Sequence, residues 1–112
     1  MSAITTHVLD TALGQPASGV PVRLEWLGPD AERPVVLAEG VTDADGRIRD
    51  LGPDRLEPGA YRLVFEVAAY ASATRQRYFL SAVDISFTPT GNAHHHVPLL
   101  LSPFGCSAYR GS

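Results

Sequence analysis

Side chains that could exchange protons gather near the end of the sequence. Residues 93–112 read AHHHVPLLLSPFGCSAYRGS, in which three histidines precede an apolar run and a tail with the last tyrosine and arginine. A histidine titrates near neutral pH, so it can act as a general base or a general acid. The segment therefore allows a catalytic site, a metal site or only a solvated strand end.

The three histidines are not expected to form one cluster. Successive side chains of a strand point to opposite faces. One face of the expected strand carries His94, His96, Pro98 and Leu100, and the other carries His95, Val97, Leu99 and Leu101. The apolar face predicts the core side, so we expect His95 inside and His96 outside. Because Pro98 cannot donate to a ladder, we expect this strand at a sheet edge or near a bulge.

The tail is expected to return beside this strand. SPFG places Pro103 second and Gly105 fourth, as a type I turn prefers, and CSAYRG can then form a paired last strand. Such a hairpin brings Tyr109 toward His96. Zinc stays open as an alternative, with His94 and His96 as two ligands and His7 as a third, although no carboxylate or cysteine is obviously placed beside them.

The elements that must hold these residues read as strands. Short stretches rich in β-branched and aromatic residues lie between scattered prolines and glycines, a pattern typical of all-β proteins. We expect strands at 4–9, 20–27, 35–41, 60–67, 78–87, 93–101 and 106–111, and one short helix at 68–76. In TDADGR, the Asp-Gly pair predicts a turn with positive φ at Gly46. These elements predict an all-β fold, a β-sandwich with mainly antiparallel pairing.

Length and composition restrict the class of protein. The 112 residues predict one domain (1–112), with 45% hydrophobic residues and 19% charged residues. A net charge of -3 gives no basic footprint for nucleic acid. The single cysteine, Cys106, cannot form an internal disulfide, and no apolar stretch approaches the roughly 18 residues of a membrane span. We expect a cytoplasmic protein without a membrane anchor.

Three segments carry a resemblance that covers nearly the whole chain in order and spacing. HVLDTALGQPASGVPV, TDADGRI and HVPLLLSPFGCSAYRGS resemble the transthyretin-related family, in particular its 5-hydroxyisourate hydrolase branch. HVLD and the terminal YRGS are the specific parts, because the hormone-carrying transthyretin branch lacks them. The resemblance implies a prealbumin-like β-sandwich of two four-stranded sheets and a homotetramer with its sites at the dimer-dimer interface.

The resemblance also implies an activity and its residues. Family members hydrolyse 5-hydroxyisourate, a product of urate oxidation, to 2-oxo-4-hydroxy-4-carboxy-5-ureidoimidazoline, without metal or cofactor. The positions that match the family's catalytic residues are His7, Arg47, His96 and Tyr109. Those implied to bind substrate are His7, Arg47, Tyr109, Arg110, Gly111 and Ser112. Which histidine is the base stays open.

Two other classes compete with the hydrolase. A small-molecule carrier of the transthyretin type would bind an aromatic ligand in the same channel without turnover. A non-catalytic sandwich module of the carboxypeptidase-regulatory type resembles residues 19–65, and that resemblance fails after them. His7 and the YRGS tail argue against the carrier.

Overall fold

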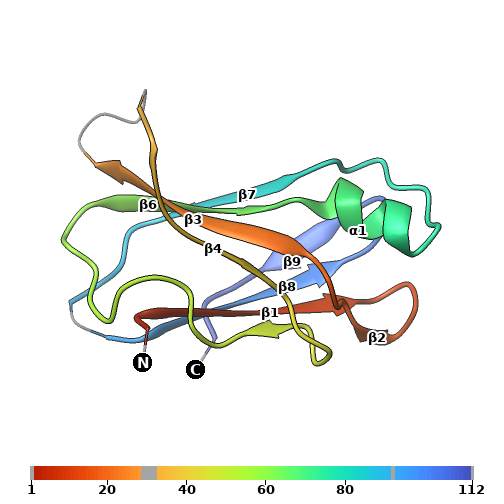
Figure 1. The fold of residues 1–112 in the computed structure, drawn as a ribbon, viewed down its shortest axis with the longest axis horizontal. Coiled ribbons are helices and arrows are strands. Elements are labelled where there is room, and N and C mark those ends of the chain that lie inside the picture. The colour runs from red at the N-terminus through yellow and green to blue at the C-terminus, as the bar shows by residue number, and fades with distance from the viewer. Residues whose placement is uncertain (1, 29–32, 92, 112) are drawn as a thin grey trace.

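The computed structural model describes residues 2–28, 33–91 and 93–111, which form strands and one helix (Figure 1). The elements in chain order are β1 (Ile4–Asp10), β2 (Gln15–Pro16), β3 (Pro21–Gly28), β4 (Val35–Val41), β5 (Arg47–Ile48), β6 (Ala60–Phe65), α1 (Val67–Ala73), β7 (Val83–Phe87), β8 (His95–Leu101) and β9 (Cys106–Ala108). Residues 78–82, expected as strand, are not part of one; there Phe79 N–H instead donates to the carbonyl oxygen of Pro103 at 2.8 Å.

The strands form two sheets packed face to face (Figure 1). The first follows the order β2-β1-β8-β9, with β5 also paired to β1, and the second follows β4-β3-β6-β7. Every pair of strands given for the described residues is antiparallel except β1 with β8, which is parallel. The predicted mainly antiparallel β-sandwich is confirmed, and β5 extends the first sheet beyond four strands.

Alternating burial along the strands builds the core between the sheets. In β1 every second residue from Ile4 to Asp10 is buried, so the residues between them face outward. The expected inner faces are confirmed in β6 and β8, whose buried members include Tyr61, Leu63, Phe65, Val97, Leu99 and Leu101. In β3 the alternation holds to Leu24, after which a register shift interrupts it. The first sheet therefore has one face in the core and one face free.

Asp10, the last residue of β1, ties the first sheet to the helix. Its carboxylate is buried and accepts hydrogen bonds from Tyr70 Oη at 2.6 Å, Gln76 Nε2 at 3.0 Å and the Leu13 N–H at 2.8 Å. Burial raises the pKa of Asp10, but these hydrogen bonds outweigh it, and the pKa lies below its ordinary value. The charge of the HVLD segment is thus held inside the fold.

The position expected for β8 is wrong. Although it contains Pro98, β8 lies inside its sheet, between β1 and β9. Tyr109 N–H donates to the Pro98 carbonyl oxygen at 3.4 Å, so the backbone polar groups of Pro98 point toward the β9 side. They are not among the groups that hydrogen-bond to β1. The missing N–H therefore removes one bond to the tail, where β9 already ends at Ala108.

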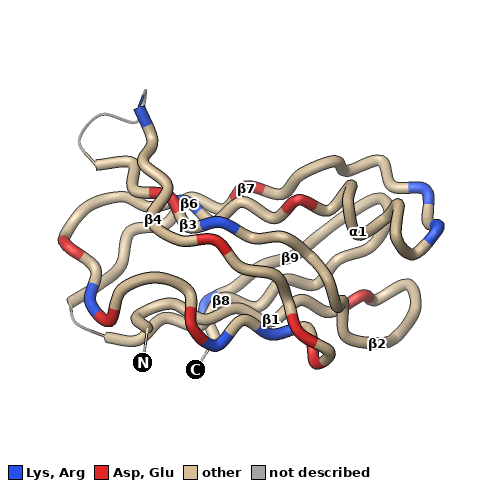
Figure 2. Tube along the Cα trace, in the orientation of Figure 1, with Lys and Arg blue, Asp and Glu red and all other residues tan. Residues whose placement is uncertain are grey.

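Basic and acidic residues are spread along the whole trace and do not form one block of either sign (Figure 2). All nine basic residues other than histidine are arginines. Among the described residues, no helix has both the length and the apolar character that crossing a membrane requires.

Candidate active site

Arg47 is placed by the tight turn that precedes it. Asp43 Oδ1 accepts hydrogen bonds from the Asp45 N–H at 2.9 Å and the Arg47 N–H at 3.0 Å. Gly46 has the predicted positive φ, +76°, and a Cβ there would lie 2.4 Å from the Val8 carbonyl oxygen. Only glycine fits this close approach to β1. The turn therefore fixes where β5 begins.

Pairing with β1 then brings Arg47 beside the first histidine. Arg47 lies opposite His7 in the β1–β5 ladder, and both side chains are half-buried. His7 Nε2 contacts the Asp45 carbonyl oxygen at 2.9 Å, which holds the ring against the turn. Arg49, not Arg47, forms the ion pairs with Asp43 and Asp45, at 2.7 and 3.6 Å. This leaves Arg47 directed to the free face of the sheet.

The parallel pairing of β1 with β8 adds the second histidine. Thr5 lies opposite His96, and His7 lies opposite Pro98 two residues further along. His96 is half-buried on the free face, as predicted. An open hollow of about 370 Å³ covers this part of the sheet; it is lined by Thr5, Thr6, Arg47, Ile48, Arg49, His94 and His96.

The surroundings of His96 favour its neutral form. Burial lowers the pKa of His96 below its ordinary value of 6.5, and the nearby positive charges of Arg47, His7 and His94 lower it further. A neutral imidazole can accept a proton at neutral pH. The geometry thus places a candidate base next to a permanent cation.

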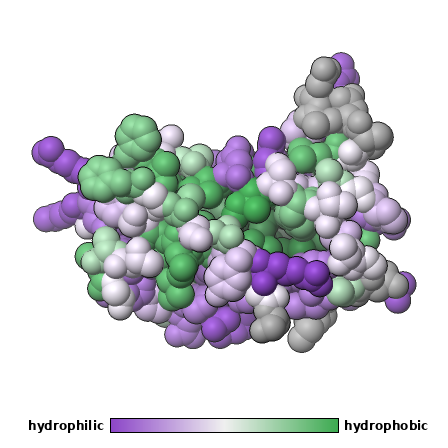
Figure 3. Space-filling view, turned by 180° about the vertical axis from the view of Figure 1, so that it is seen from behind, coloured by the Kyte–Doolittle hydropathy of each residue, from purple (hydrophilic) through white to green (hydrophobic). Residues whose placement is uncertain are grey.

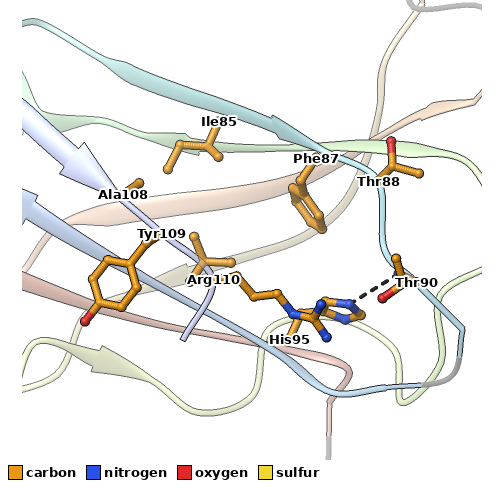
Figure 4. A pocket seen from close by; sticks show the side chains of 9 residues that line it. Ile85, Phe87, Thr88, Thr90, His95, Ala108, Tyr109 and Arg110 are labelled. Atoms are coloured by element: carbon orange, nitrogen blue, oxygen red, sulfur yellow. Dashed lines mark hydrogen bonds between the residues drawn. The ribbon is translucent and has the colours of Figure 1, made fainter. Parts of the chain in front are cut away.

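His95 points to the opposite side of the sheet, which confirms the predicted separation of the histidines. Its side chain is 6% exposed, and its Nε2 accepts a hydrogen bond from the Thr90 N–H at 3.3 Å (Figure 4). Among the described atoms, no group lies in hydrogen-bond geometry to its Nδ1. Burial lowers the pKa of His95, and the charge of Arg110 lowers it further.

The tail reaches the hollow through its backbone. Gly111 N–H donates to the His96 carbonyl oxygen at 2.7 Å, and a Cβ at Gly111 would lie 2.9 Å from His96 Cδ2. Tyr109, Arg110 and His95 are among the residues that line a cavity of about 230 Å³; there the Arg110 side chain extends toward His95, whereas the Tyr109 ring points away from it (Figure 4). Tyr109 N–H donates to the Pro98 carbonyl oxygen at 3.4 Å, so the tail runs back beside β8 toward His96, as predicted. Ser112 lies outside the described residues.

The zinc alternative finds no gathered set of ligands. Within residues 2–28, 33–91 and 93–111, no three histidine, cysteine or acidic side chains stand close enough to hold one metal ion. That range contains His7, His94 and His96. His94 and His96 instead share contacts with one hydroxyl, Thr5 Oγ1, at 3.0 and 2.8 Å.

Thr5 was not singled out from the sequence, although it lines the hollow and contacts both His94 and His96. A signal existed in the residue spacing. Thr5 precedes His7 by two residues, so both side chains share the free face of β1. What the sequence lacked was the register that sets β1 against β8.

A family model and individual relatives match this chain and point to the same family. Residues 4–111 match the HIUase/Transthyretin family. The 5-hydroxyisourate hydrolase of Caulobacter vibrioides is 45% identical over 117 residues and covers 100% of both chains. The mouse 5-hydroxyisourate hydrolase is 42% identical and covers 99% of this chain and 96% of its own.

Solved structures agree in fold. The 5-hydroxyisourate hydrolase of Klebsiella pneumoniae has a TM-score of 0.83 at 37% identity and covers 100% of this chain and 94% of its own. Sea bream transthyretin in complex with thyroxine has a TM-score of 0.89 at 28% identity, with coverages of 97% and 94%. Sequence and fold thus lead to one conclusion: this chain belongs to the HIUase/Transthyretin family.

Proposed function

We propose that this protein hydrolyses 5-hydroxyisourate to 2-oxo-4-hydroxy-4-carboxy-5-ureidoimidazoline in urate degradation. One observation carries the proposal: His7, Arg47 and His96 come from β1, β5 and β8 to the free face of one sheet, where Arg47 and His96 line an open hollow and His7 lies opposite Arg47. Relatives that match at full length are named 5-hydroxyisourate hydrolases. The hydrolases are more similar in sequence than the transthyretin that binds thyroxine, which favours turnover over carriage.

The residues present supply what opening a cyclic amide requires. A base takes a proton from water, and the water oxygen bonds to the ring carbonyl carbon. The carbon–nitrogen bond then breaks, and an acid returns a proton to the departing nitrogen. We assign these two proton transfers to His96 and His7. Arg47 stays charged and offers planar donors to the carbonyl oxygen as it gains negative charge.

We assign substrate binding to the tail as well as to His7 and Arg47. The tail residues of this proposal are Tyr109, Arg110, Gly111 and Ser112. Gly111 already packs against His96, so the backbone of the tail borders the hollow. Tyr109 is 55% exposed, which leaves its ring free to turn over the substrate and donate its hydroxyl.

We further propose that the working protein is a cytoplasmic homotetramer with its sites between two dimers. The free face of the first sheet leaves the hollow open on one side, where a second copy would close it. Edge strands β7 and β9 each pair with a single strand in the described chain. Hydrophobic side chains gather on the side seen in Figure 3, and Phe79 and Phe104 are among the most exposed.

The test is the ultraviolet decay of freshly made 5-hydroxyisourate, with and without the protein. The proposal expects the decay to be faster than the spontaneous rate, and no acceleration would end it. His96→Ala should lower the rate by about 10²–10⁴-fold, the usual contribution of one general base or acid. His95→Ala is the matched control from the same strand, and it should keep the activity while it is folded. Equal losses in both variants would contradict the assigned roles.

A further inference from the structure

Four groups form a continuous hydrogen-bonded chain that ends at His96. The Ser2 carbonyl oxygen lies 3.1 Å from His94 Nδ1. His94 Nε2 lies 3.0 Å from Thr5 Oγ1, and Thr5 Oγ1 lies 2.8 Å from His96 Nδ1. The chain crosses from the start of the sequence to β8 on the free face of the sheet. It contacts one ring nitrogen of His96 and leaves Nε2 outside it.

The chemistry of the first group sets the direction of every bond. A carbonyl oxygen only accepts, so the proton between Ser2 and His94 belongs to His94 Nδ1. In neutral His94 the other nitrogen, Nε2, then carries a lone pair and accepts from the Thr5 hydroxyl. A hydroxyl has a single proton. With that proton given to His94, Thr5 Oγ1 must accept from His96, which places the proton of His96 on Nδ1.

We propose that Thr5 and His94 are positioning residues that hold His96 in its Nδ1–H tautomer, so that Nε2 is the atom that takes the proton from the attacking water. This inference rests on the proposed hydrolase function and deepens it by assigning the base to His96. The proton of the water goes to His96 Nε2, and the water oxygen bonds to the carbonyl carbon.

The contacts of His7 fit the complementary role. The Asp45 carbonyl oxygen also only accepts, so His7 Nε2 carries a proton and the free nitrogen is Nδ1. The second histidine is thus held by backbone alone, without a hydroxyl or histidine behind it. To return a proton to the departing nitrogen, His7 must carry a second proton, on Nδ1, which it gives up while Nε2 keeps its own proton on the Asp45 carbonyl oxygen.

The charges around His96, like the hydrogen-bonded chain, favour a neutral His96 ring. The titratable and charged groups that face it are His7 on β1, Arg47 and Arg49 at β5, and His94 before β8. All four are cationic or become so on protonation. Each therefore disfavours a second proton on His96. Protonation of His94 would reverse the direction of these hydrogen bonds, because His94 Nε2 would then donate to Thr5 Oγ1.

The direct test is the tautomer of His96, read from nitrogen NMR of the full chain labelled at histidine. An unprotonated ring nitrogen resonates far downfield of a protonated one, so the two tautomers are distinct. We expect the downfield signal at Nε2 in the wild type at pH 7.5. A proton on Nε2 there would overturn the proposal, whatever the activity.

Substitutions of Thr5 test the cause. Thr5→Val keeps a β-branched side chain without the hydroxyl, so the His96 proton should spread over both nitrogens. The rate should fall by about 10–100-fold, as is typical when the partner of a catalytic group is removed. Thr5→Ser keeps the hydroxyl and should restore both signals and rate. Unchanged His96 signals in Thr5→Val would refute the role of Thr5.

Thr11→Val is the matched control for the loss of a hydroxyl. Thr11 Oγ1 donates to the Leu101 carbonyl oxygen at 3.1 Å, at the far end of β8. This variant should keep the wild-type signals and rate, and a loss equal to that of Thr5→Val would refute the proposal.

His94→Ala tests the other positioning residue. The change frees the Thr5 hydroxyl to donate to His96 Nδ1, so the proton of His96 should move toward Nε2. Unchanged signals in this variant would remove His94 from the chain. If the wild type does not accelerate substrate decay, the proposed function fails, whereas the NMR result still decides on the tautomer.

Discussion

The hydrogen bond between Asp10 and Tyr70 offers a test of what stabilises the fold at a place outside the candidate site. Tyr70→Phe removes the hydroxyl that donates to Asp10 at 2.6 Å and changes little else of the side chain. Both residues are almost fully buried, at 1% and 2% exposed. No water can replace the lost donor without opening the core. Asp10→Asn and the double variant complete a cycle.

The structure sets the size of the effect. A hydrogen bond to a buried charged group contributes about 1.5–3 kcal/mol. Tyr70→Phe should lower the free energy of unfolding by this amount, out of roughly 5–15 kcal/mol for a domain. At roughly 4 °C per kcal/mol, the melting temperature should fall by about 6–12 °C. Asp10→Asn should cost more, because it also weakens the bonds from Gln76 and Leu13.

Urea unfolding followed by the fluorescence of Trp26 is a suitable assay. Trp26 is the single tryptophan, and its ring packs edge-on against Tyr61 in the core at 4.9 Å. Protein concentration must be fixed, since assembly adds to apparent stability. The cycle should give a coupling of about 1.5–3 kcal/mol between the two substitutions. Additive losses, or a Tyr70→Phe change under about 0.5 kcal/mol, would refute the reasoning.

Three further substitutions test the site and its surroundings. Burial lowers the pKa of His95, so His95 binds a proton more readily in the unfolded chain than in the folded chain. The free energy of unfolding should therefore fall as the pH drops below 6.5. His95→Leu should reduce this pH dependence, measured by urea unfolding at pH 7.5 and pH 5. Gly111→Ala places a Cβ 2.9 Å from His96 and should lower kcat by about 10–100-fold, whereas Gly105→Ala, with its nearest atom at 3.9 Å, should not. Arg47→Lys loses the planar donor fork and should lower kcat/KM by about 10–100-fold in the decay assay, and an unchanged value would remove Arg47 from the site.

The sequence predicted the features that follow from local geometry. The alternation of side chains along 94–101 separated His95 from His96, and β8 has that separation. The Asp-Gly pair predicted the turn at Gly46 and its positive φ. These results depend on neighbouring residues alone, for which the period of a strand and the freedom of glycine suffice.

Features that depend on distant pairing were missed. Pro98 suggested an edge strand, but β8 is interior, and the Pro98 backbone faces the tail just beyond the end of β9. Thr5 gained its importance from the parallel register with His96, which no local pattern indicates. The roles of the site residues stay predictions until the variants are measured.

The parallel pairing of β1 with β8 also determines how late in folding the candidate site can form. Thr5 and His96 are 91 residues apart in a chain of 112 residues. During synthesis the first strand leaves the ribosome long before its partner and cannot complete its sheet until β8 follows. Closing so long a loop makes this pairing a slow step of folding. The face that carries the candidate site is therefore among the last parts to form, and a chain truncated before β8 would expose the core face of β1 and favour aggregation.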